Sequence, residues 1–483
     1  MENDSKRLVM AIGLSAAILF SWQFFFAPKP IEQKPTEVSE VSKEVAKTPE
    51  ATAAAESAPF EKQSVTVKKG GYEFALSNDL SINNTNSPNV KSTFKEVVGV
   101  DSPFSIQAIN PQTQKAEILK VNFSNISESE IAGETEGSGI KVSAKILDNG
   151  RLSLSLKSQT PYRYRLIFKS FKEEAPNHKY REFIFLDKST HRHAVEKSFS
   201  EEEKMKWMGI DHKFHLATFI LPEKSQAKVS AVEDSNVMTV DFSEATSDFK
   251  GDFLFAVKNY DELAKMGDNL QLAVDFGIFG ILAVPILRGL QFFYTWIPNY
   301  GWSIVLLTLL IRLITYPLQY KSFKSMKKMQ EIQPELTRIK EKYKGDAQRM
   351  QKETMALFKK AGANPLGGCL PILIQMPVFF AFYKVLGEAI ELVGAPYIFW
   401  ITDLSHKDPF FVLPILMTAA MWLQQKYTPT TTADPMQKKI MMFMPLIFGF
   451  IMKDLPSGLV LYIFVSTLFG ILQQLWVYRT TPG

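Results

Sequence analysis

The sequence predicts a polytopic α-helical membrane protein that carries an extracytoplasmic all-β sandwich domain. Two observations lead to this fold class. Apolar runs lie near the N-terminus and throughout residues 300–479, and they approach the roughly 20 helical residues that a bilayer core about 30 Å thick requires. Between these runs, residues 60–268 alternate apolar and polar side chains in short segments separated by turn residues, as strands do. We expect six transmembrane helices, five of which form one core.

Charge and cysteine content restrict the class of protein further. The chain has 483 residues, 46% of them hydrophobic, and a net charge of +5. The positive charge is concentrated in residues 321–363, which hold twelve Lys and Arg against five Asp and Glu. Cys369 is the only cysteine, so the sequence contains no disulfide framework, although this does not exclude an oxidising compartment.

Residues 1–26 predict a short cytoplasmic tip followed by a membrane anchor. Lys6 and Arg7 precede an apolar run of 19 residues, 8–26. A cleaved signal peptide is the alternative, but the run is long and no small-x-small cleavage site follows it. Residues 27–59 contain five prolines and no aromatic side chain, which is typical of a disordered linker.

Residues 60–268 predict one β-sandwich domain. The clearest signal is a hairpin, in which Asp148-Asn149-Gly150 separates the alternating runs 140–147 and 151–156. Asn-Gly supplies the positive φ angles of a tight turn. Similar runs recur over about 200 residues, which is enough for a domain with its own core.

The same domain contains histidines that could be metal ligands. His191 and His193 fall in a polar loop, and His212 and His215 lie near the start of a strand. No cysteine or carboxylate has the spacing of a metal ligand to them. We therefore expect neither a metal site nor a cofactor.

Residues 269–299 predict an amphipathic helix in the outer membrane–water interface. The segment is apolar, but Asp275, Pro285 and Arg288 interrupt it, and Trp296 lies near its end, where aromatic anchors are common. A spanning helix is the alternative. It would place the lysine-rich segment that follows outside the cytoplasm, contrary to the positive-inside rule.

Residues 300–320 predict the second transmembrane helix, and Arg312 is its one full charge. An arginine at the centre of such a helix costs about 2.5–3.5 kcal/mol on insertion scales, so it suggests a function. At about 100° per residue, Thr308, Thr315 and Gln319 share a helix face with it. Snorkelling of the side chain to the cytoplasmic end is the alternative, but it leaves the other polar residues unexplained.

Residues 321–363 predict a basic helical hairpin in the cytoplasm. Two helices, Lys321–Lys342 and Asp346–Lys360, are separated by a Lys-Gly turn, and Pro334 kinks or interrupts the first. We expect the hairpin to capture a partner through basic and adaptable apolar side chains. These are Lys324, Lys327, Lys328, Met326, Met329, Met350 and Met355. The alternative is a solvated loop that only fixes the topology.

Residues 364–479 predict transmembrane helices three to six, followed by a short tail at 480–483. The apolar runs are 366–386, 410–425, 440–452 and 459–478. The acidic loop 387–409 would lie outside and the lysine-bearing loop 426–439 inside. Both termini are then cytoplasmic, and the β-domain lies outside the cytoplasm.

Polar side chains recur inside the later helices. They are Gln375 in the third, Gln425 in the fourth, and Tyr462, Ser466 and Gln473 in the sixth. Each alone is typical of an interhelical hydrogen bond worth about 0.6 kcal/mol, but together with Arg312 they indicate a wet cavity with one fixed positive charge. Hydrolase and nucleotide-binding motifs do not occur where they would be meaningful, so we do not expect an enzyme.

Several motifs in residues 270–479 are specific enough to indicate a family. They are Arg312-Leu-Ile-Thr-Tyr-Pro-Leu, Asn364-Pro-Leu-Gly-Gly-Cys-Leu-Pro-Ile-Leu-Ile-Gln-Met-Pro377, Asp434-Pro-Met-Gln and Leu455-Pro-Ser-Gly-Leu-Val-Leu-Tyr462. These motifs resemble the YidC/Oxa family of membrane protein insertases. A β-domain after a first anchor resembles the Gram-negative YidC type with a large periplasmic domain.

The resemblance implies an insertase and chaperone for integral membrane proteins in the bacterial inner membrane, working alone or with the Sec translocon. A polar segment of a nascent membrane protein would enter a hydrophilic groove around Arg312, and its apolar span would leave into lipid. The family's cytoplasmic hairpin corresponds to residues 321–363. The chain stops at Gly483 without the long basic tail that some members use at the ribosome, so the ribosome is a weaker candidate partner. Direct binding of nucleic acid is not expected.

Two other classes of protein are alternatives. A secondary transporter or channel would use Arg312 to bind an anionic solute, but the five core helices lack the paired repeats with broken helices that transporters show. An anchored β-domain that binds a partner above a passive membrane base leaves the polar side chains of the helices unexplained.

Overall fold

The structure, a computed structural model of the full chain, describes residues 62–86, 104–170, 181–212, 214–233, 235–362, 370–428 and 435–480. The predicted anchor, the linker, Cys369 and nearly all of the short tail lie outside these residues. The chain divides into two compact units, Met1–Phe60 with Ile332–Gly362 and Glu61–Glu331 with Ala363–Gly483.

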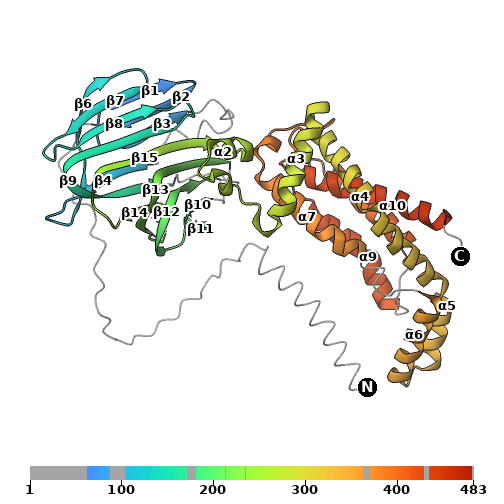
Figure 1. Ribbon diagram of the computed structural model, residues 1–483. Coiled ribbons are helices and arrows are strands. Elements are labelled where there is room, and N and C mark those ends of the chain that lie inside the picture. Colours follow the sequence, from blue (N-terminus) through green and yellow to red (C-terminus); the bar gives the residue numbers. More distant parts are fainter. Residues whose placement is uncertain are drawn as a thin grey trace, which may run out of the picture. The chain divides into compact units, whose positions relative to one another are not determined.

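The strands of the second unit form one continuous antiparallel sheet, with the order β1-β2-β3-β4-β9-β14-β13-β12-β10-β11 along its main path (Figure 1). Within the described residues the strands are β1 (Ser64–Lys69), β2 (Tyr72–Ser77), β3 (Ser81–Asn86), β4 (Phe104–Ile109), β5 (Ala116–Ile118), β6 (Val121–Ile126), β7 (Glu130–Thr135), β8 (Lys141–Ile146), β9 (Leu152–Lys169), β10 (Glu182–Leu186), β11 (Thr190–Ala194), β12 (Phe199–Asp211), β13 (His215–Ala231), β14 (Val237–Phe242) and β15 (Thr246–Val257). The strand-rich domain that the sequence predicts is therefore confirmed.

The hairpin at residue 150 joins β8 to β9, as the sequence predicts, with Ile146 opposite Leu152. The turn itself differs from the predicted one. Gly150 has a φ of +79°, whereas Asn149 is not among the residues with positive φ. The Gly150 amide donates to the Leu147 carbonyl at 3.0 Å. Glycine is needed at this position because a Cβ here would also overlap the ring of Tyr72.

The core of the strand-rich domain follows from the alternation in its strands. In β9, Leu152, Leu154 and Leu156 are at most 2% exposed, while the serines between them face the other way. Phe104 of β4 stacks on Phe219 of β13 with a centroid distance of 5.2 Å, although these strands are not neighbours in the sheet. Side chains from non-adjacent strands thus meet in one apolar core.

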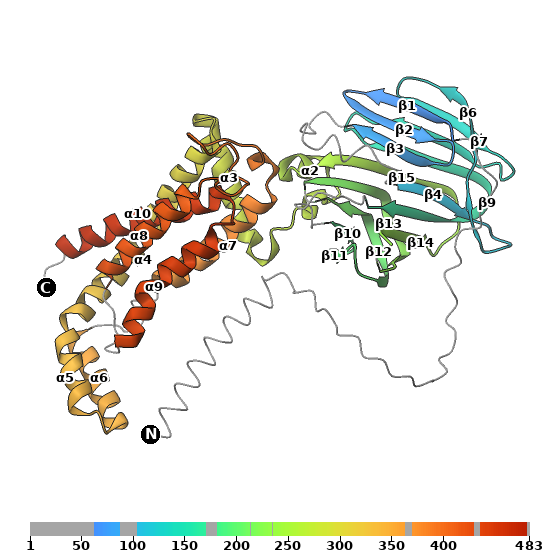
Figure 2. The same cartoon turned by 180° about the vertical axis from the view of Figure 1, so that it is seen from behind.

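The helices of the second unit follow the sheet in the chain. They are α2 (Tyr260–Met266), η2 (Leu270–Ala273), η3 (Gly277–Phe279), α3 (Gly280–Trp296), α4 (Tyr300–Glu331), α7 (Leu370–Glu388), η5 (Ile390–Leu392), α8 (Val412–Tyr427), α9 (Pro435–Met452) and α10 (Ser457–Thr480). α10 packs against both α4 and α8 (Figure 2). Large apolar side chains on the outer faces of the helices, such as Ile314 of α4 and Phe450 of α9, are 67% and 71% exposed, as expected of surfaces that contact lipid.

Three helices in the described residues are long and apolar enough to cross a membrane: Gly277–Trp296, Tyr300–Glu331 and Ser457–Thr480. A shorter apolar helix covers Ile440–Met452. The first of the three includes α3, which the sequence analysis assigns to the membrane–water interface. By length and composition, this helix could therefore also cross the membrane, which is the alternative given in the sequence analysis.

The predicted cytoplasmic hairpin begins differently in the structure. The helix expected over Lys321–Lys342 is two helices, because α4 continues to Glu331 and α5 (Gln333–Lys342) begins after Ile332. Pro334 lies in the first turn of α5, where its missing N–H costs no helical hydrogen bond. Of the two predicted alternatives, the structure therefore has the interruption, which falls at Ile332 just before the proline, and not the kink.

The second predicted hairpin helix is confirmed as α6 (Ala347–Ala361). Asp346 caps its N-terminus by accepting a hydrogen bond from the Arg349 amide, and Gly362 ends it in the left-handed conformation. α5 and α6 pack against each other, and each contributes a buried leucine, Leu336 and Leu357.

Candidate functional site

Arg312 lies within α4 and forms hydrogen bonds with α10. Its Nε and Nη2 atoms donate to Ser466 Oγ at 2.9 and 2.6 Å, and its Nη1 atom donates to Gln319 Oε1 at 2.9 Å. Gly470 of α10 lies beside the guanidinium, since a Cβ there would be in ordinary van der Waals contact with Arg312 Nη1 at 3.5 Å. The guanidinium is thus held between the two helices rather than extended along α4.

The polar face predicted for α4 is partly a connected network. Gln319 Nε2 donates to Thr315 Oγ1 at 2.8 Å, and Gln319 is 3% exposed. Thr308 is also buried, but its hydroxyl donates to the Ile304 carbonyl at 2.6 Å, one turn back in the same helix. The structure therefore brings together Arg312, Thr315 and Gln319. Thr308 lies on the same helix, but its side chain is bonded to the backbone of α4 instead.

α7 reaches the same network through Gln375. Its Nε2 atom donates to the Tyr462 hydroxyl and lies 3.2 Å from Ser466 Oγ, which also accepts from it. The ring of Tyr462 stacks on Phe382 of α7 with a centroid distance of 4.1 Å. Ser466 therefore connects three helices, and the predicted residues Gln375, Tyr462 and Ser466 meet at Arg312.

Two predicted glutamines are placed differently from the others. Gln473 donates to the Arg312 backbone carbonyl at 3.4 Å and bonds no side chain of this network in the described part of the chain. Gln425 is partly exposed in α8, and its place in the groove stays a prediction. Its neighbour Gln424 lies close to α10, since a Cβ on Gly470 would lie 2.9 Å from Gln424 Nε2.

The sequence analysis also misses Gln474, which is 1% exposed. Its Nε2 atom donates to the Tyr427 carbonyl at 3.0 Å, so it links α10 to the end of α8. The available signal is its spacing, because positions 466, 470 and 474 lie on one face of α10.

The charge of Arg312 has only neutral partners among the described residues. Its three hydrogen bonds end on a serine hydroxyl and an amide oxygen, and no ion pair found in that part of the chain includes it. A guanidinium has five N–H donors, so these bonds leave some of them for another acceptor. An unpaired charge in a low-dielectric surrounding attracts an anionic group strongly.

The predicted capture residues divide into two groups. Lys324 and Met355 are exposed, Lys328 and Met350 are partly exposed, and Lys327 donates to the Tyr478 carbonyl of α10 at 3.3 Å. Met326 and Met329 are each 5% exposed, and Met326 packs in a cluster with Phe323 and Val477. Their predicted role as an adaptable apolar surface is therefore wrong, because both belong to the packed end of α4.

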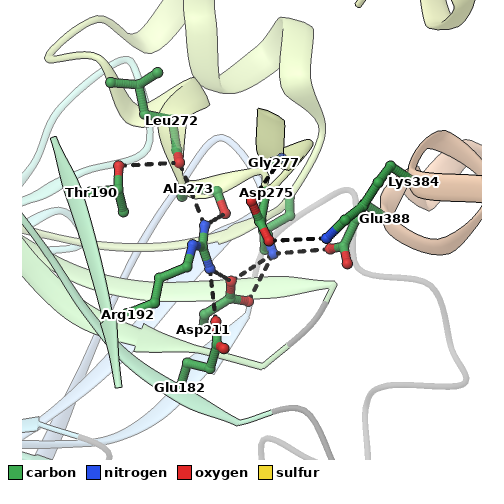
Figure 3. Close-up of polar contacts among 11 residues, drawn as sticks. Glu182, Thr190, Arg192, Asp211, Leu272, Ala273, Asp275, Gly277, Lys384 and Glu388 are labelled. Atoms are coloured by element: carbon green, nitrogen blue, oxygen red, sulfur yellow. Dashed lines mark hydrogen bonds and ion pairs between the residues drawn. The ribbon is translucent and has the colours of Figure 1, made fainter. Parts of the chain in front are cut away.

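A second polar network joins the strand-rich domain to α7 (Figure 3). Lys258, 1% exposed, donates to both carboxylate oxygens of Asp211 at 2.9 and 2.7 Å, and Asp211 also accepts from Arg192 Nη1 at 2.9 Å. On the α7 side, Glu388 lies 3.8 Å from Lys258.

The segment that leads into α3 takes part in this network as well (Figure 3). Arg192 Nη2 donates to the Ala273 carbonyl at 2.5 Å, and Lys384 of α7 lies 3.1 Å from Asp275. Burial of Asp275 favours its neutral form, but Lys384 and Arg192 outweigh it and lower the pKa of the carboxyl below its usual value. α7 therefore has Gln375 at the Arg312 network, Lys384 at the segment that leads into α3, and Glu388 near Lys258 of the strand-rich domain.

The chain is similar to known proteins over nearly all of its length. The family model described as "60Kd inner membrane protein" matches residues 292–483, and the model described as "YidC periplasmic domain" matches residues 153–288. A membrane protein insertase YidC of Campylobacter jejuni is 34% identical over 98% of this chain and 96% of its own length. One of Wolinella succinogenes is 46% identical over 56% of this chain and 50% of its own length.

Among solved structures, an active YidC insertase crystal structure covers 98% of this chain and all of its own, with a TM-score of 0.41 and 18% identity. The matches to the two family models and the full-length relatives agree with the division into a strand-rich domain and apolar helices. The chain belongs to the family of YidC membrane protein insertases.

Proposed function

We propose that this protein inserts integral membrane proteins into the bacterial inner membrane and helps them fold, alone or with the Sec translocon. The relatives that match it along their full length are membrane protein insertases. The observation that carries the mechanism is Arg312, a positive charge among apolar helices whose partners in the described residues are neutral.

The physical problem for such a protein is the polar segment that must cross the membrane. In hydrocarbon, each unsatisfied backbone or side-chain group costs several kcal/mol. The polar side chains around Ser466 offer hydrogen-bond partners inside the helices, and the remaining N–H groups of Arg312 would bind a carboxylate of the segment. This hydrophilic groove shortens the path through hydrocarbon, while the apolar span of the substrate leaves along the exposed apolar faces into lipid.

The hairpin of α5 and α6 would meet the substrate first. It is basic, and its exposed residue Met355, 51% exposed, offers an apolar contact that adapts to different sequences. Lys324, near the end of α4, is exposed as well. Met326 and Met329 are not part of this contact because they are buried.

The proposal also includes the topology that the sequence predicts: six spans, five of them in the core, both termini cytoplasmic, and a periplasmic β-sandwich. The stacking of Phe104 on Phe219 from strands that are not neighbours supports a sheet folded into two layers. In a Cys369→Ser background, a cysteine at position 188 should react with a membrane-impermeant maleimide in intact cells lacking the outer membrane, and one at position 344 only after permeabilisation. The reverse pattern would overturn the topology.

Site-specific crosslinking tests the groove directly. A photoreactive residue at position 315 or 319 is expected to crosslink to the polar segment of a stalled nascent membrane protein, because both side chains contact the Arg312 network. Position 313, whose leucine is 67% exposed, is the matched control and should reach lipid or the apolar span. Crosslinks to the polar segment from position 313 alone would contradict the groove.

Reconstitution separates this function from transport of an anionic solute. Proteoliposomes containing only this protein should insert a small single-span substrate and show no more flux of anionic solutes than empty liposomes. Solute flux without insertion would favour a transporter instead.

A further inference from the structure

Two histidines and a glutamate meet on the strand-rich domain, away from the helices that the proposed function uses. The sequence analysis places His191 and His193 in a polar loop, but they lie in β11. Alternate residues of a strand point to one face, so both histidines share a face while Arg192 between them turns to the Asp211 network (Figure 3). Glu201 of β12 approaches the histidines from across the turn that joins the two strands.

The distances in this cluster are those between the ligands of one small metal ion. His191 Nδ1 lies 3.3 Å from Glu201 Oε2, and His193 Nε2 lies 3.1 Å from Glu201 Oε1. One nitrogen or oxygen from each residue falls within 4.8 Å of the other two. Tetrahedral Zn²⁺ with bonds of about 2.0–2.1 Å separates its ligands by about 3.3 Å, so small side-chain movements suffice to bind it.

The surroundings orient the two rings as ligands. Asp187 Oδ1 lies 3.1 Å from His191 Nε2, and the other ring nitrogen, Nδ1, faces Glu201. Such a carboxylate–histidine pair is the usual second contact of a metal-bound imidazole. The rings also stack on phenylalanines, His191 on Phe185 at 4.7 Å and His193 on Phe199 at 4.0 Å.

The position of His193 Nε2 favours a ligand over a simple hydrogen-bonded pair. This atom is buried and makes no hydrogen bond with any of the described residues, although the Glu201 carboxylate is 3.1 Å away. A buried nitrogen without a hydrogen bond destabilises the folded state, and coordination of a metal ion would remove this cost. The side chains of His191, His193 and Glu201 are 30%, 23% and 34% exposed, so an ion can enter from solvent.

We propose that His191, His193 and Glu201 bind a divalent transition-metal ion, with Zn²⁺ as the fitting ion and water as its fourth ligand. Two imidazoles and one carboxylate suit zinc and leave one position open. The ion would tie the end of β11 to the start of β12. This inference is independent of the proposed insertase function.

Titration of the full-length protein in detergent tests the site. After removal of metal by a chelator, Zn²⁺ measured by calorimetry should bind one ion per chain and raise the thermal unfolding temperature. His193→Gln and Glu201→Gln should each weaken binding at least tenfold and abolish the rise. His406→Gln is the matched control, because His406 is 65% exposed and pairs with Asp403 outside the strand-rich domain.

Two results would overturn the proposal. One is the lack of saturable Zn²⁺ binding by the wild-type protein. The other is equal affinity in the wild type and in both folded variants, which would mean that the cluster holds only a histidine–carboxylate contact. Unchanged insertion activity in all variants is compatible with the metal site. A negative result for zinc binding therefore does not affect the proposed insertase function, and the reverse also holds.

Discussion

At the scale of single residues, the candidate site depends on how Arg312 is held. Ser466 accepts from two atoms of the guanidinium and Gln319 from a third. The planar fork of arginine makes this possible, and a lysine ammonium would not reproduce it. Because these acceptors are neutral, the charge is positioned without being neutralised.

Replacement of Arg312 should slow insertion of substrates with acidic extracytoplasmic tails. Two opposite charges 4 Å apart interact by about 4 kcal/mol at an effective dielectric constant near 20, so we expect Arg312→Ala to slow such substrates at least tenfold and Arg312→Glu to slow them more. The insertion rate of Arg312→Lys should lie between those of the wild type and Arg312→Ala. The measurement is the initial rate of insertion into proteoliposomes.

The control is Arg288→Ala, because the Arg288 side chain is 54% exposed on α3 and pairs with Asp261. The insertion rate of substrates without acidic residues should change least in every variant. Full activity of a folded Arg312→Glu protein on acidic substrates would exclude the electrostatic role.

At the scale of elements, α7 links the candidate site to the strand-rich domain. Gln375 contacts Tyr462 and Ser466, while Lys384 and Glu388 at the other end approach Asp275 and Lys258. Several of these groups are buried, and a buried charge is stable only when it is paired. The position of α7 therefore depends on both ends.

Loss of Lys258 should destabilise this link. Lys258→Met removes one partner of a buried pair and leaves Asp211 with Arg192 alone, a change that typically costs about 3–5 kcal/mol. Thermal unfolding in detergent should therefore occur at a clearly lower temperature. Lys250→Met is the matched control on β15, the strand that precedes Lys258, because Lys250 is 50% exposed. Equal unfolding temperatures of the two variants would show that the network is not stabilising.

His215 should make the strand-rich domain less stable in mild acid. Burial, and next the nearby Lys258, lower the pKa of His215 to about 4 from the usual 6.5. Between these values the unfolded chain binds a proton that the folded chain does not, so stability is full above pH 6.5 and falls as the pH approaches 4. The loss is at most about 3.5 kcal/mol, at about 1.4 kcal/mol per pH unit.

Denaturant unfolding of the wild type and of His215→Gln at several pH values measures this contribution. The glutamine variant should lose the part of the pH dependence between 6.5 and 4. Parallel curves for the two proteins would contradict the assignment to His215.

At the scale of the whole molecule, the strand-rich domain and the helices share apolar core. One buried cluster contains Trp207 and Leu216 from the strands together with Leu287 of α3 and Leu386 of α7. The two parts are distinct in sequence but not independent in packing. The proposed groove, however, is built from α4, α7 and α10, with no side chain from the strands among its contacts in the described residues.

Deletion of most of residues 60–250 should therefore separate stability from function. We expect insertion of small substrates to continue, because the Arg312 network is retained, and the unfolding temperature to fall, because the shared core is exposed. Insertion is measured in proteoliposomes and folding by thermal unfolding. If a deletion protein that still folds cannot insert any substrate, the domain is not accessory.

The sequence alone determined the features that depend on local periodicity and composition. Alternation predicts the strands and apolar length predicts the membrane helices. Helical spacing places Arg312, Thr315 and Gln319 on one face, and two of these side chains do bond to the third. The motifs indicated the family for the same reason, since they are contiguous in the chain.

Only the tertiary structure decided which side chains meet across elements. It bonds Gln474 to the Tyr427 carbonyl, buries Met326 against Val477, and brings Glu201 to two histidines on another strand. None of these contacts has a sequence spacing that predicts it. These contacts depend on the rotation of each helix relative to its neighbours and on the path of each strand. Packing over the whole chain sets both the rotation and the path.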